Sequence, residues 1–293
     1  MMTLREPDPL RPSASPSQKL LEDTLPILDL DHPGASDPDY RARRLHIASL
    51  ARAYREQPEG AFPVVEYTEA EHEIWRKLQA VLGQLHAEHA CCAYGEGRAR
   101  LALPTTYIPQ LGEVSARLGA VTGFRLWPVE GLVLPRLFLQ HLERGIMLST
   151  QYIRHPSRPF FTPEPDIVHE LLGHAPMLAH RPLAELSRLV GKGARLASEA
   201  ELAQLGRLYW FTVEFGLIEE QGGVKAFGAG LLGGVEDLRR AFSAEADVRP
   251  FDLEQVLGLE YDYNHPQPVY FVIPSFERLC ADVGAFVARL EAG

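Results

Sequence analysis

The sequence is poor in cysteine, has no long apolar run and carries no excess of positive charge. Its 3 cysteines among 293 residues are too few and too scattered for a disulfide framework, which indicates a reducing, cytoplasmic compartment. Charges and prolines fill the N-terminus where a signal peptide needs an apolar stretch, and no segment reaches the roughly 18 apolar residues of a membrane helix. A net charge of -10 disfavours nucleic-acid binding, which requires a basic surface. Small molecules are therefore the expected partners.

Most of the chain has apolar residues at steps of three and four, the pattern of amphipathic helices. It predicts helices over residues 40–54, 69–89, 109–120, 134–143, 182–190, 200–220, 235–242 and 275–291. Strand-like segments are few and short, over residues 124–127, 146–149, 224–227 and 269–273. This distribution predicts a mainly α single domain over residues 31–293, preceded by a Pro-rich N-terminal arm over residues 1–30.

A glycine motif, Gly228-Ala-Gly230-Leu-Leu-Gly233, satisfies the G-x-G-x-x-G pattern of dinucleotide-binding loops. It falls late in the chain, without the alternation of strands and helices that a dinucleotide-binding fold needs. We favour a tight turn beside the functional site as its interpretation.

The segment Asp166-Ile-Val-His-Glu-Leu-Leu-Gly-His174 resembles the H-E-x-x-H helix of zinc proteases with one additional residue. On an α-helix, histidines four residues apart differ by about 40° in direction and can share a metal ion, whereas histidines five apart differ by about 140°. Either the helix loosens or ends between His169 and His174, or the two imidazoles do not bind one ion. Gly173 and Pro176 favour an end of the helix.

A stiff loop precedes these histidines, since 4 of the 11 residues from Pro156 to Asp166 are prolines. Proline fixes φ and restricts the residue before it, so such a loop can present side chains at low entropic cost. A rigid surface loop without a functional role would have the same composition. We expect Thr162 or Asp166 to cap the helix that follows.

A carboxylate, Glu214, lies at the centre of the apolar face of the helix predicted over residues 207–218. This position is costly unless the carboxylate meets a cation, which an arginine or a metal ion would supply. With His169 and His174 it would complete a set of two histidines and one carboxylate. Such a set leaves positions open on an octahedral ferrous ion, which suits dioxygen and a second molecule.

Zinc with the same ligands would hold a hydrolytic water, and Glu170 follows His169 as the base does in the zinc proteases. The additional residue between the histidines changes the geometry and favours iron. A zinc hydrolase is kept as an alternative.

Further segments resemble the catalytic domain of the pterin-dependent aromatic amino acid hydroxylases, most closely its phenylalanine 4-hydroxylase branch. The matching segments run in order from Asp31 to Leu232: DHPG, DPDYRARR, VEY, IPQL, TGFRLWPVEGL, TQYIRH, TPEPDIVHELLGH, LYWFTVEFGL and KAFGAGLL. The resemblance implies a mainly α aromatic amino acid hydroxylase-like catalytic domain that uses Fe(II), tetrahydropterin and O2.

The resemblance also implies a role for each matching residue. The implied iron ligands are His169, His174 and Glu214. The implied pterin-binding residues are Gly131, Val133, Phe138 and Glu170. The implied substrate-binding residues are Arg154, Thr162, Pro165 and Trp210. The implied catalytic groups beside the iron and the pterin are Tyr209 and Glu170.

The first expectation for the activity is ring hydroxylation of L-phenylalanine to L-tyrosine, with L-tryptophan or another aromatic amino acid as the alternative. An inactive metal-binding homologue is a further alternative. Three segments differ from the family pattern: Gly233-Gly234 stands in place of two serines, Val133-Leu-Pro135 is more apolar, and residues 260–266 match poorly. The chain also lacks the family's regulatory and tetramer-forming segments, so we expect a monomer.

Overall fold

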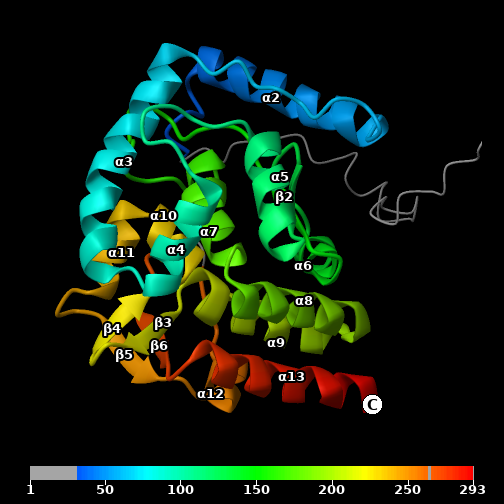
Figure 1. Ribbon diagram of the computed structural model, residues 1–293, viewed down its shortest axis with the longest axis vertical. Helices are drawn as coiled ribbons and strands as arrows, with labels where there is room; N and C mark the ends of the chain where they lie inside the picture. Colours follow the sequence, from blue (N-terminus) through cyan, green and yellow to red (C-terminus); the bar gives the residue numbers. More distant parts are fainter. Residues whose placement is uncertain (1–31, 263–264, 293) are drawn as a thin grey trace, which may run out of the picture.

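The computed structural model describes residues 32–262 and 265–292, so the predicted N-terminal arm over residues 1–30 lies outside the described part. Figure 1 shows many helices around a small sheet, which confirms the mainly α class. The α-helices are α2 (Pro38–Glu56), α3 (Glu69–His89), α4 (Cys92–Leu101), α5 (Leu111–Thr122), α6 (Pro135–Glu143), α7 (Ala175–Leu178), α8 (Arg181–Leu196), α9 (Glu199–Tyr209), α10 (Ala229–Gly233), α11 (Val235–Ala241), α12 (Leu253–Gly258) and α13 (Phe276–Ala292). Two further segments are π-helices, η1 (His169–His174) and η2 (Trp210–Glu214).

The strands form two small sheets. Strands β1 (Arg125–Pro128) and β2 (Ile146–Ser149) are a parallel pair. The second sheet has the order β4-β3-β6-β5 and consists of β3 (Leu217–Glu220), β4 (Gly223–Ala226), β5 (Asp247–Pro250) and β6 (Val269–Ile273). The antiparallel hairpin of β3 and β4 turns at Gln221 and Gly222, whose φ angles of 53° and 77° suit a two-residue turn of the primed type.

Local sequence signals explain where several helices begin and end. Thr68 and Glu71 form a capping box at the start of α3, and Ser198 and Glu201 do the same for α9. Gly123, with a φ of 76°, ends α5 in the left-handed conformation that glycine adopts without steric cost.

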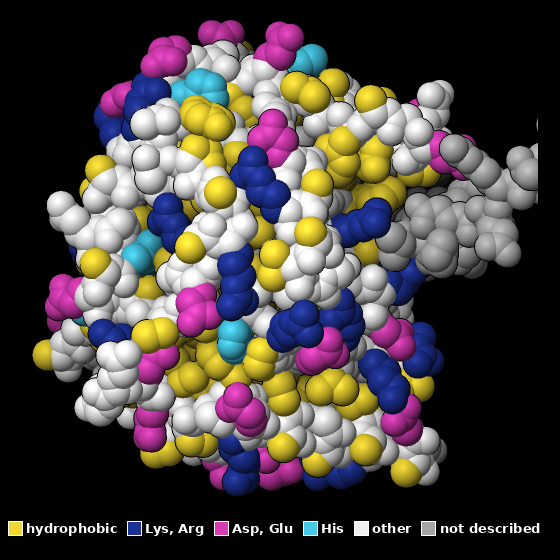
Figure 2. Space-filling model, viewed as in Figure 1, with side chains coloured by type: hydrophobic (Ala, Val, Ile, Leu, Met, Phe, Trp, Pro, Cys, Tyr) yellow, Lys and Arg dark blue, Asp and Glu magenta, His cyan; other side chains and the backbone are white. Residues whose placement is uncertain are grey.

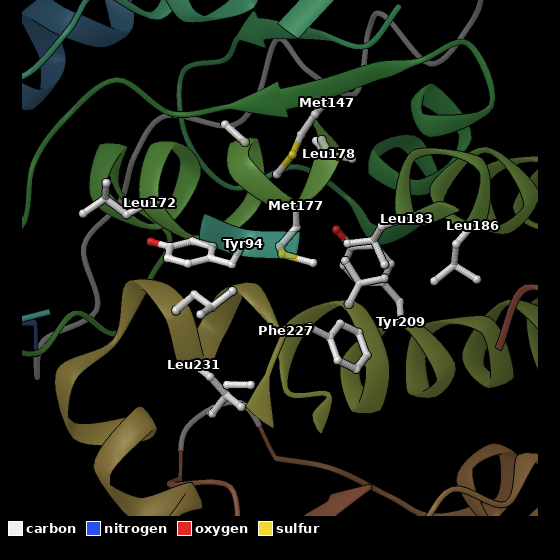
Figure 3. Packing of buried hydrophobic residues seen from close by; sticks show 14 of the residues in the cluster. Tyr94, Met147, Leu172, Met177, Leu178, Leu183, Leu186, Tyr209, Phe227 and Leu231 are labelled. Carbon is white, nitrogen blue, oxygen red and sulfur yellow. The ribbon is translucent and has the colours of Figure 1, made fainter. Parts of the chain in front are cut away.

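Apolar side chains from distant parts of the chain fill the core. Figure 3 shows Leu172 of η1, Tyr94 of α4 and Met177 of α7 on one side of α10, and Leu231 of α10 on its other side, all within this core. Each of these side chains is at most 1% exposed, and burial of an apolar side chain of this size contributes about 1.5–3 kcal/mol. The core therefore holds η1 and α10 against each other.

The structure differs from the sequence prediction most clearly over residues 200–220. The predicted helix ends at Glu214, and Leu217–Glu220 forms strand β3 instead. Leu217 and Ile218 pair with Val272 and Ile273 of β6, so long-range pairing overrides the helical period of their apolar side chains. Helices α4 and α12 and strand β5 were not predicted, because they are short and weakly patterned.

Charges of both signs are interspersed on the face of the molecule that Figure 2 shows. All three cysteines are free. Over residues 32–262 and 265–292, no helix combines the length and the apolar character that crossing a lipid bilayer requires.

Helix α4 packs closely on α7 through Gly97. A Cβ atom at Gly97 would lie 1.9 Å from the carbonyl oxygen of Pro176, far inside van der Waals contact. Gly95, on the opposite side of the same helix, is exposed and would meet no atom within 4 Å.

We therefore expect Gly97→Ala to lower the free energy of unfolding by about 1–3 kcal/mol, as overpacked cores do. Gly95→Ala should raise it by about 0.5–1 kcal/mol, because alanine favours a helix interior. Chemical denaturation of the two variants measures both changes. Equal effects of the two substitutions would contradict the close packing of α4 on α7.

Helix α3 is joined to α10 by His86, which is buried. Its Nε2 lies 2.8 Å from the Leu232 carbonyl oxygen, and its Nδ1 lies 3.2 Å from the Tyr94 hydroxyl. Because a carbonyl only accepts, Nε2 carries the proton, and Nδ1 accepts from Tyr94 in a neutral imidazole. Burial lowers the pKa of His86 to about 4.

The unfolded chain takes up a proton at His86 below its ordinary pKa of 6.5, whereas the folded chain stays neutral until about pH 4. This group therefore reduces the free energy of unfolding as the pH falls from about 6.5 to about 4. His86→Gln keeps a donor and an acceptor but does not titrate, so the decline over this range should be shallower. Denaturation curves at several pH values measure it, and a slope equal to that of the wild type would rule out a neutral buried His86.

Candidate active site

The π-helix η1 resolves the spacing of the two histidines. In a π-helix each N–H bonds to the carbonyl five residues earlier, as the Ala175 N–H does to Glu170 here. Residues five apart thus lie one above the other, and the rings of His169 and His174 come within 4.6 Å between centroids. The helix loosens between them and continues into α7, so the predicted end at Gly173 and Pro176 is wrong.

The second π-helix, η2, ends at Glu214 and repeats this geometry, with the Phe215 N–H bonded to the Trp210 carbonyl at 2.9 Å. The Glu214 carboxylate lies 3.1 Å from His174 Nε2 and 3.5 Å from His169 Nε2. Among the described residues its basic partners are these two imidazoles, and the arginine that was the alternative is not one of them. One ligand atom from each of the three residues lies within 4.8 Å of the others.

The three side chains have a composition and exposure that suit a metal ion with open positions. His174 is 3% exposed, whereas His169 and Glu214 are 15% and 13% exposed, so one side of the group is accessible. Burial lowers the pKa of His169 to about 4, which leaves its imidazole neutral and able to bind a metal at neutral pH. Burial opposes charge on His174 as well, but the closer Glu214 carboxylate outweighs it and raises the pKa.

The glycine motif over residues 228–233 packs against both π-helices. Cβ atoms at Gly228 and Gly230 would lie 2.4 Å and 3.1 Å from the Glu214 carbonyl oxygen, and one at Gly233 would lie 3.0 Å from His169 Cα. Gly228 precedes α10 and the other two glycines lie within it, so the predicted tight turn is wrong although its place beside the site is right. The motif allows one helix to contact the backbones of two candidate ligands. We name residues 228–233 the glycine clasp.

The two glycines that replace serines in the family pattern have little room for a side chain. A Cβ at Gly234 would lie 2.6 Å from Asp237 Oδ2 and 2.7 Å from the Gly230 carbonyl oxygen. From the other side, a Cβ at Gly173 of η1 would lie 2.5 Å from the Ala229 carbonyl oxygen. The contact between η1 and α10 thus depends on glycine in both helices.

Glu170 is buried beside the histidines with one oxygen satisfied. Its Oε1 accepts from the Thr150 N–H at 3.1 Å and lies 3.2 Å from the Thr150 hydroxyl, whose single hydrogen is donated to the Pro165 carbonyl. Its Oε2 is buried without a hydrogen-bond partner, and burial raises the pKa of the carboxyl to about 7. A buried acceptor that lacks a donor is costly, so this oxygen suits a ligand N–H.

Arg154, predicted to bind a carboxylate, is paired with a carboxylate of the protein. Its Nε and Nη2 each donate to Asp166 at 2.8 Å, and both side chains are almost fully buried. Asp166 also accepts from the His169 N–H at 3.1 Å, so it caps the helix and the alternative cap Thr162 is wrong. Asp166 therefore connects the Arg154 guanidinium to η1, the helix that carries His169 and His174. The sequence indicated its capping role but not its ion pair.

The stiff loop over residues 156–166 is fixed by a second buried pair. Arg44 of α2 donates to both oxygens of Glu164 at 2.7 and 3.1 Å, and the Tyr152 hydroxyl donates to the same carboxylate at 3.0 Å. Within this loop the Thr162 hydroxyl donates to the Glu164 carbonyl, and the Pro165 carbonyl accepts from Thr150. Both predicted substrate-binding residues are half-buried.

Aromatic side chains adjoin the metal site. Tyr209 is buried, with its ring 6.4 Å from that of His174 and 5.7 Å from that of Phe138 of α6. Trp210 is half-buried, and its indole N–H donates to Gln267 at 2.8 Å. The structure thus places Tyr209 beside His174 and Phe138 beside Tyr209, and it joins Trp210 to a glutamine that the sequence did not indicate.

The predicted pterin loop, with Gly131 and Val133, follows β1 and is anchored at Glu130. This carboxylate is 5% exposed and lies 2.7 Å from Arg52 and 2.9 Å from Arg55, both on α2. Glu130 was not singled out from the sequence, because its partners lie more than seventy positions earlier in the chain.

The fold and the site together define the general class of this chain. It is a mainly α protein with a candidate mononuclear metal site of two histidines and one carboxylate. The family model of the biopterin-dependent aromatic amino acid hydroxylases matches residues 16–292. The chain belongs to this family, which confirms the resemblance drawn from the motifs.

Curated relatives include two activities. The chain is 44% identical over 270 residues to tyrosine 3-monooxygenase of Homo sapiens, covering 91% of this chain and 51% of that protein. It is 42% identical over 268 residues to phenylalanine-4-hydroxylase of Rattus norvegicus, covering 90% of this chain and 58% of that protein. The chain thus spans little more than half the length of these relatives.

Solved structures with the same fold include phenylalanine hydroxylases. The enzyme of Legionella pneumophila superposes with a TM-score of 0.73 at 34% identity, over 80% of this chain and 94% of that one. The enzyme of Chromobacterium violaceum with bound iron(III) and 7,8-dihydrobiopterin superposes with a TM-score of 0.72 at 32% identity, over 78% of this chain and 84% of that one.

The glycine clasp predicts an effect on metal binding. Gly228→Ala would place a Cβ 2.4 Å from the Glu214 carbonyl oxygen and so displace the residue. We expect Fe(II) affinity to fall by about tenfold or more, as for other lost supports of a ligand. The control Gly223→Ala, in the adjoining hairpin, meets its nearest atom at 3.9 Å. Anaerobic Fe(II) titration with a thermal melt measures both, and equal affinities would refute a role of the clasp.

Proposed function

We propose that the chain is a monooxygenase that hydroxylates the ring of an aromatic amino acid with Fe(II), tetrahydropterin and O2. The observation that carries the proposal is the convergence of His169, His174 and Glu214 within 4.8 Å in a chain of this family. When bound, ferrous iron and tetrahydropterin supply the electrons that activate dioxygen. The protein contributes position, orientation and exclusion of water.

His169, His174 and Glu214 are the proposed iron ligands. Two imidazoles and a carboxylate on one side of an ion leave the opposite side open, which suits an octahedral ferrous ion that binds O2, and a hydrolytic zinc ion can use the same three ligands. The related enzyme of Chromobacterium violaceum is known with iron(III) bound, which supports the choice of iron over zinc.

Phe138, Gly131, Val133 and Glu170 are the proposed pterin-binding residues. The Phe138 ring would stack on the pterin, and the backbone of Gly131 and Val133 would bond its edge. Glu170 Oε2, which is buried without a partner, offers an acceptor for a ring N–H. The pKa of about 7 lets Glu170 hold or release a proton at this oxygen near neutral pH.

Arg154, Thr162, Pro165 and Trp210 are the proposed substrate-binding residues. Asp166 holds Nε and Nη2 of the Arg154 guanidinium, so Nη1 would be the nitrogen left to bind the carboxylate of the amino acid, at little entropic cost. Thr162, Pro165 and Trp210 would surround its ring. Tyr209, between His174 and Phe138, would border the iron and the pterin together.

L-Phenylalanine is the proposed substrate, giving L-tyrosine. Related solved structures include phenylalanine hydroxylases, which supports this choice, whereas curated relatives named tyrosine 3-monooxygenase and phenylalanine-4-hydroxylase have a similar identity to the chain. L-Tyrosine and L-tryptophan are therefore the competing substrates to be tested. The monomeric state and the cytoplasmic location remain predictions from the sequence.

Anaerobic loading with Fe(II), followed by O2, tetrahydropterin and each of the three amino acids, tests the proposal by product analysis. Tyrosine from phenylalanine is the expected product. Activity with zinc in the absence of O2 would favour the hydrolase instead. Bound iron without product from any of the three would favour an inactive homologue.

Glu214→Gln tests the ligand assignment, because an amide binds Fe(II) far more weakly than a carboxylate. We expect at least about a tenfold loss of Fe(II) affinity and a matching loss of hydroxylation, with little change in thermal stability. The matched control is Glu219→Gln, an exposed carboxylate five residues later on β3. Iron content equal in both variants would show that Glu214 is not a ligand.

A further inference from the structure

Trp210 is held by side chains from a part of the chain that carries none of the family motifs. The ring of Tyr261 stacks on the indole with centroids 4.5 Å apart and planes at 17°. The indole N–H donates to Gln267 Oε1 at 2.8 Å. Both residues lie between α12 and β6, about fifty positions after Trp210 in the sequence.

Gln267 is a buried polar residue whose orientation is determined by its partners. It is 3% exposed, and its Nε2 donates to the Val269 carbonyl at 2.5 Å while its Oε1 accepts from Trp210. The indole N–H can only donate and the carbonyl can only accept, so the amide has one arrangement that satisfies both. The indole therefore cannot rotate in its plane without leaving a buried acceptor unpaired.

The segment that carries Tyr261 is attached to α9, the helix that leads into Trp210. Glu260 forms an ion pair with Arg207 of α9, and Arg207 also donates to the Leu257 carbonyl at 3.2 Å. The Tyr261 ring contacts the Phe211 ring edge-on at 6.4 Å between centroids. This arrangement fixes the stacking ring over one face of Trp210, so that the indole cannot tilt.

We propose that Tyr261 and Gln267 are positioning residues that set the plane of Trp210 and thereby the selectivity for the substrate ring. The inference rests on the proposed function, in which Trp210 borders the aromatic ring of the amino acid. Stacking limits tilt and the hydrogen bond limits in-plane rotation, so the two contacts together leave one orientation. Glu214 is supported separately by the glycine clasp, so loosening Trp210 leaves the metal site in place.

Tyr261→Leu and Tyr261→Phe form a matched pair, because only phenylalanine keeps a ring over the indole. Anaerobic calorimetry of the Fe(II) protein with L-phenylalanine and L-tryptophan measures binding without turnover. In the leucine variant we expect L-phenylalanine to bind about two- to tenfold more weakly, the size of a lost aromatic contact. The ratio of the affinities for L-phenylalanine and L-tryptophan should become smaller in Tyr261→Leu, and its Fe(II) content should be unchanged. Tyr261→Phe should have the wild-type values.

Emission of Trp210 provides a second readout that needs neither metal nor substrate. The Trp210 signal of each variant is its emission minus the emission of the same variant with Trp210→Phe added. This subtraction removes the emission of the other two tryptophans, Trp75 and Trp127, because both proteins contain them. Acrylamide should quench this difference more strongly in Tyr261→Leu than in Tyr261→Phe. Gln267→Met removes the hydrogen-bond acceptor of the indole N–H at a similar side-chain volume, and it should also weaken L-phenylalanine binding. This variant tests the inference if Tyr261→Leu does not fold.

Wild-type-like binding, preference and quenching in both Tyr261→Leu and Gln267→Met would overturn the inference while leaving the proposed function intact. Loss of Fe(II) in these variants would also overturn it, since the residues would then support the metal site. A wild-type protein that neither binds nor converts any aromatic amino acid would instead remove the proposed function, and the inference with it.

Discussion

The hydrogen bond from each N–H to the carbonyl five residues earlier, in the two π-helices, is the constraint on which the site depends. An α-helix would point His169 and His174 in different directions, whereas η1 places them one above the other. The same pattern in η2 ends at Glu214, which faces both imidazoles. π-Helical turns are uncommon and lose the better geometry of the α-helix, so the surrounding packing must stabilise them.

That packing comes mainly from α10 and the core beneath it. Gly228, Gly230 and Gly233 let α10 and the residue before it contact the backbone of both π-helices at distances that a side chain at Gly228 would prevent and one at Gly230 or Gly233 would disturb. Buried apolar residues of both helices, among them Leu172 and Leu231, belong to the core around this contact (Figure 3). A densely packed interior transmits small displacements, so metal-ligand geometry and core packing are coupled here.

The side of the site assigned to the substrate is held by charge instead of by apolar packing. Arg154 is fixed by Asp166, and the loop that carries Asp166 is fixed by the pair of Arg44 with Glu164. Buried ion pairs of this kind contribute little net stability, because desolvation offsets their attraction, but they impose a definite geometry. A guanidinium held in one orientation is a suitable partner for a planar carboxylate. Close packing thus positions the candidate metal ligands, whereas buried ion pairs position the guanidinium proposed to bind the substrate.

The sequence alone determined the helical class, the order of most elements and the candidate metal ligands His169, His174 and Glu214, which the structure brings together. It could do so because helical periodicity, capping residues and ligand types are local properties, and because the motifs are collinear with those of one family. Only the tertiary structure decided that η1 loosens where Gly173 and Pro176 indicated an end, that residues 217–220 form a strand, and that Glu130, Asp166 and Gln267 support the site. These features depend on partners far away in the chain, and no local pattern records which distant side chain will neutralise a charge or satisfy a buried donor.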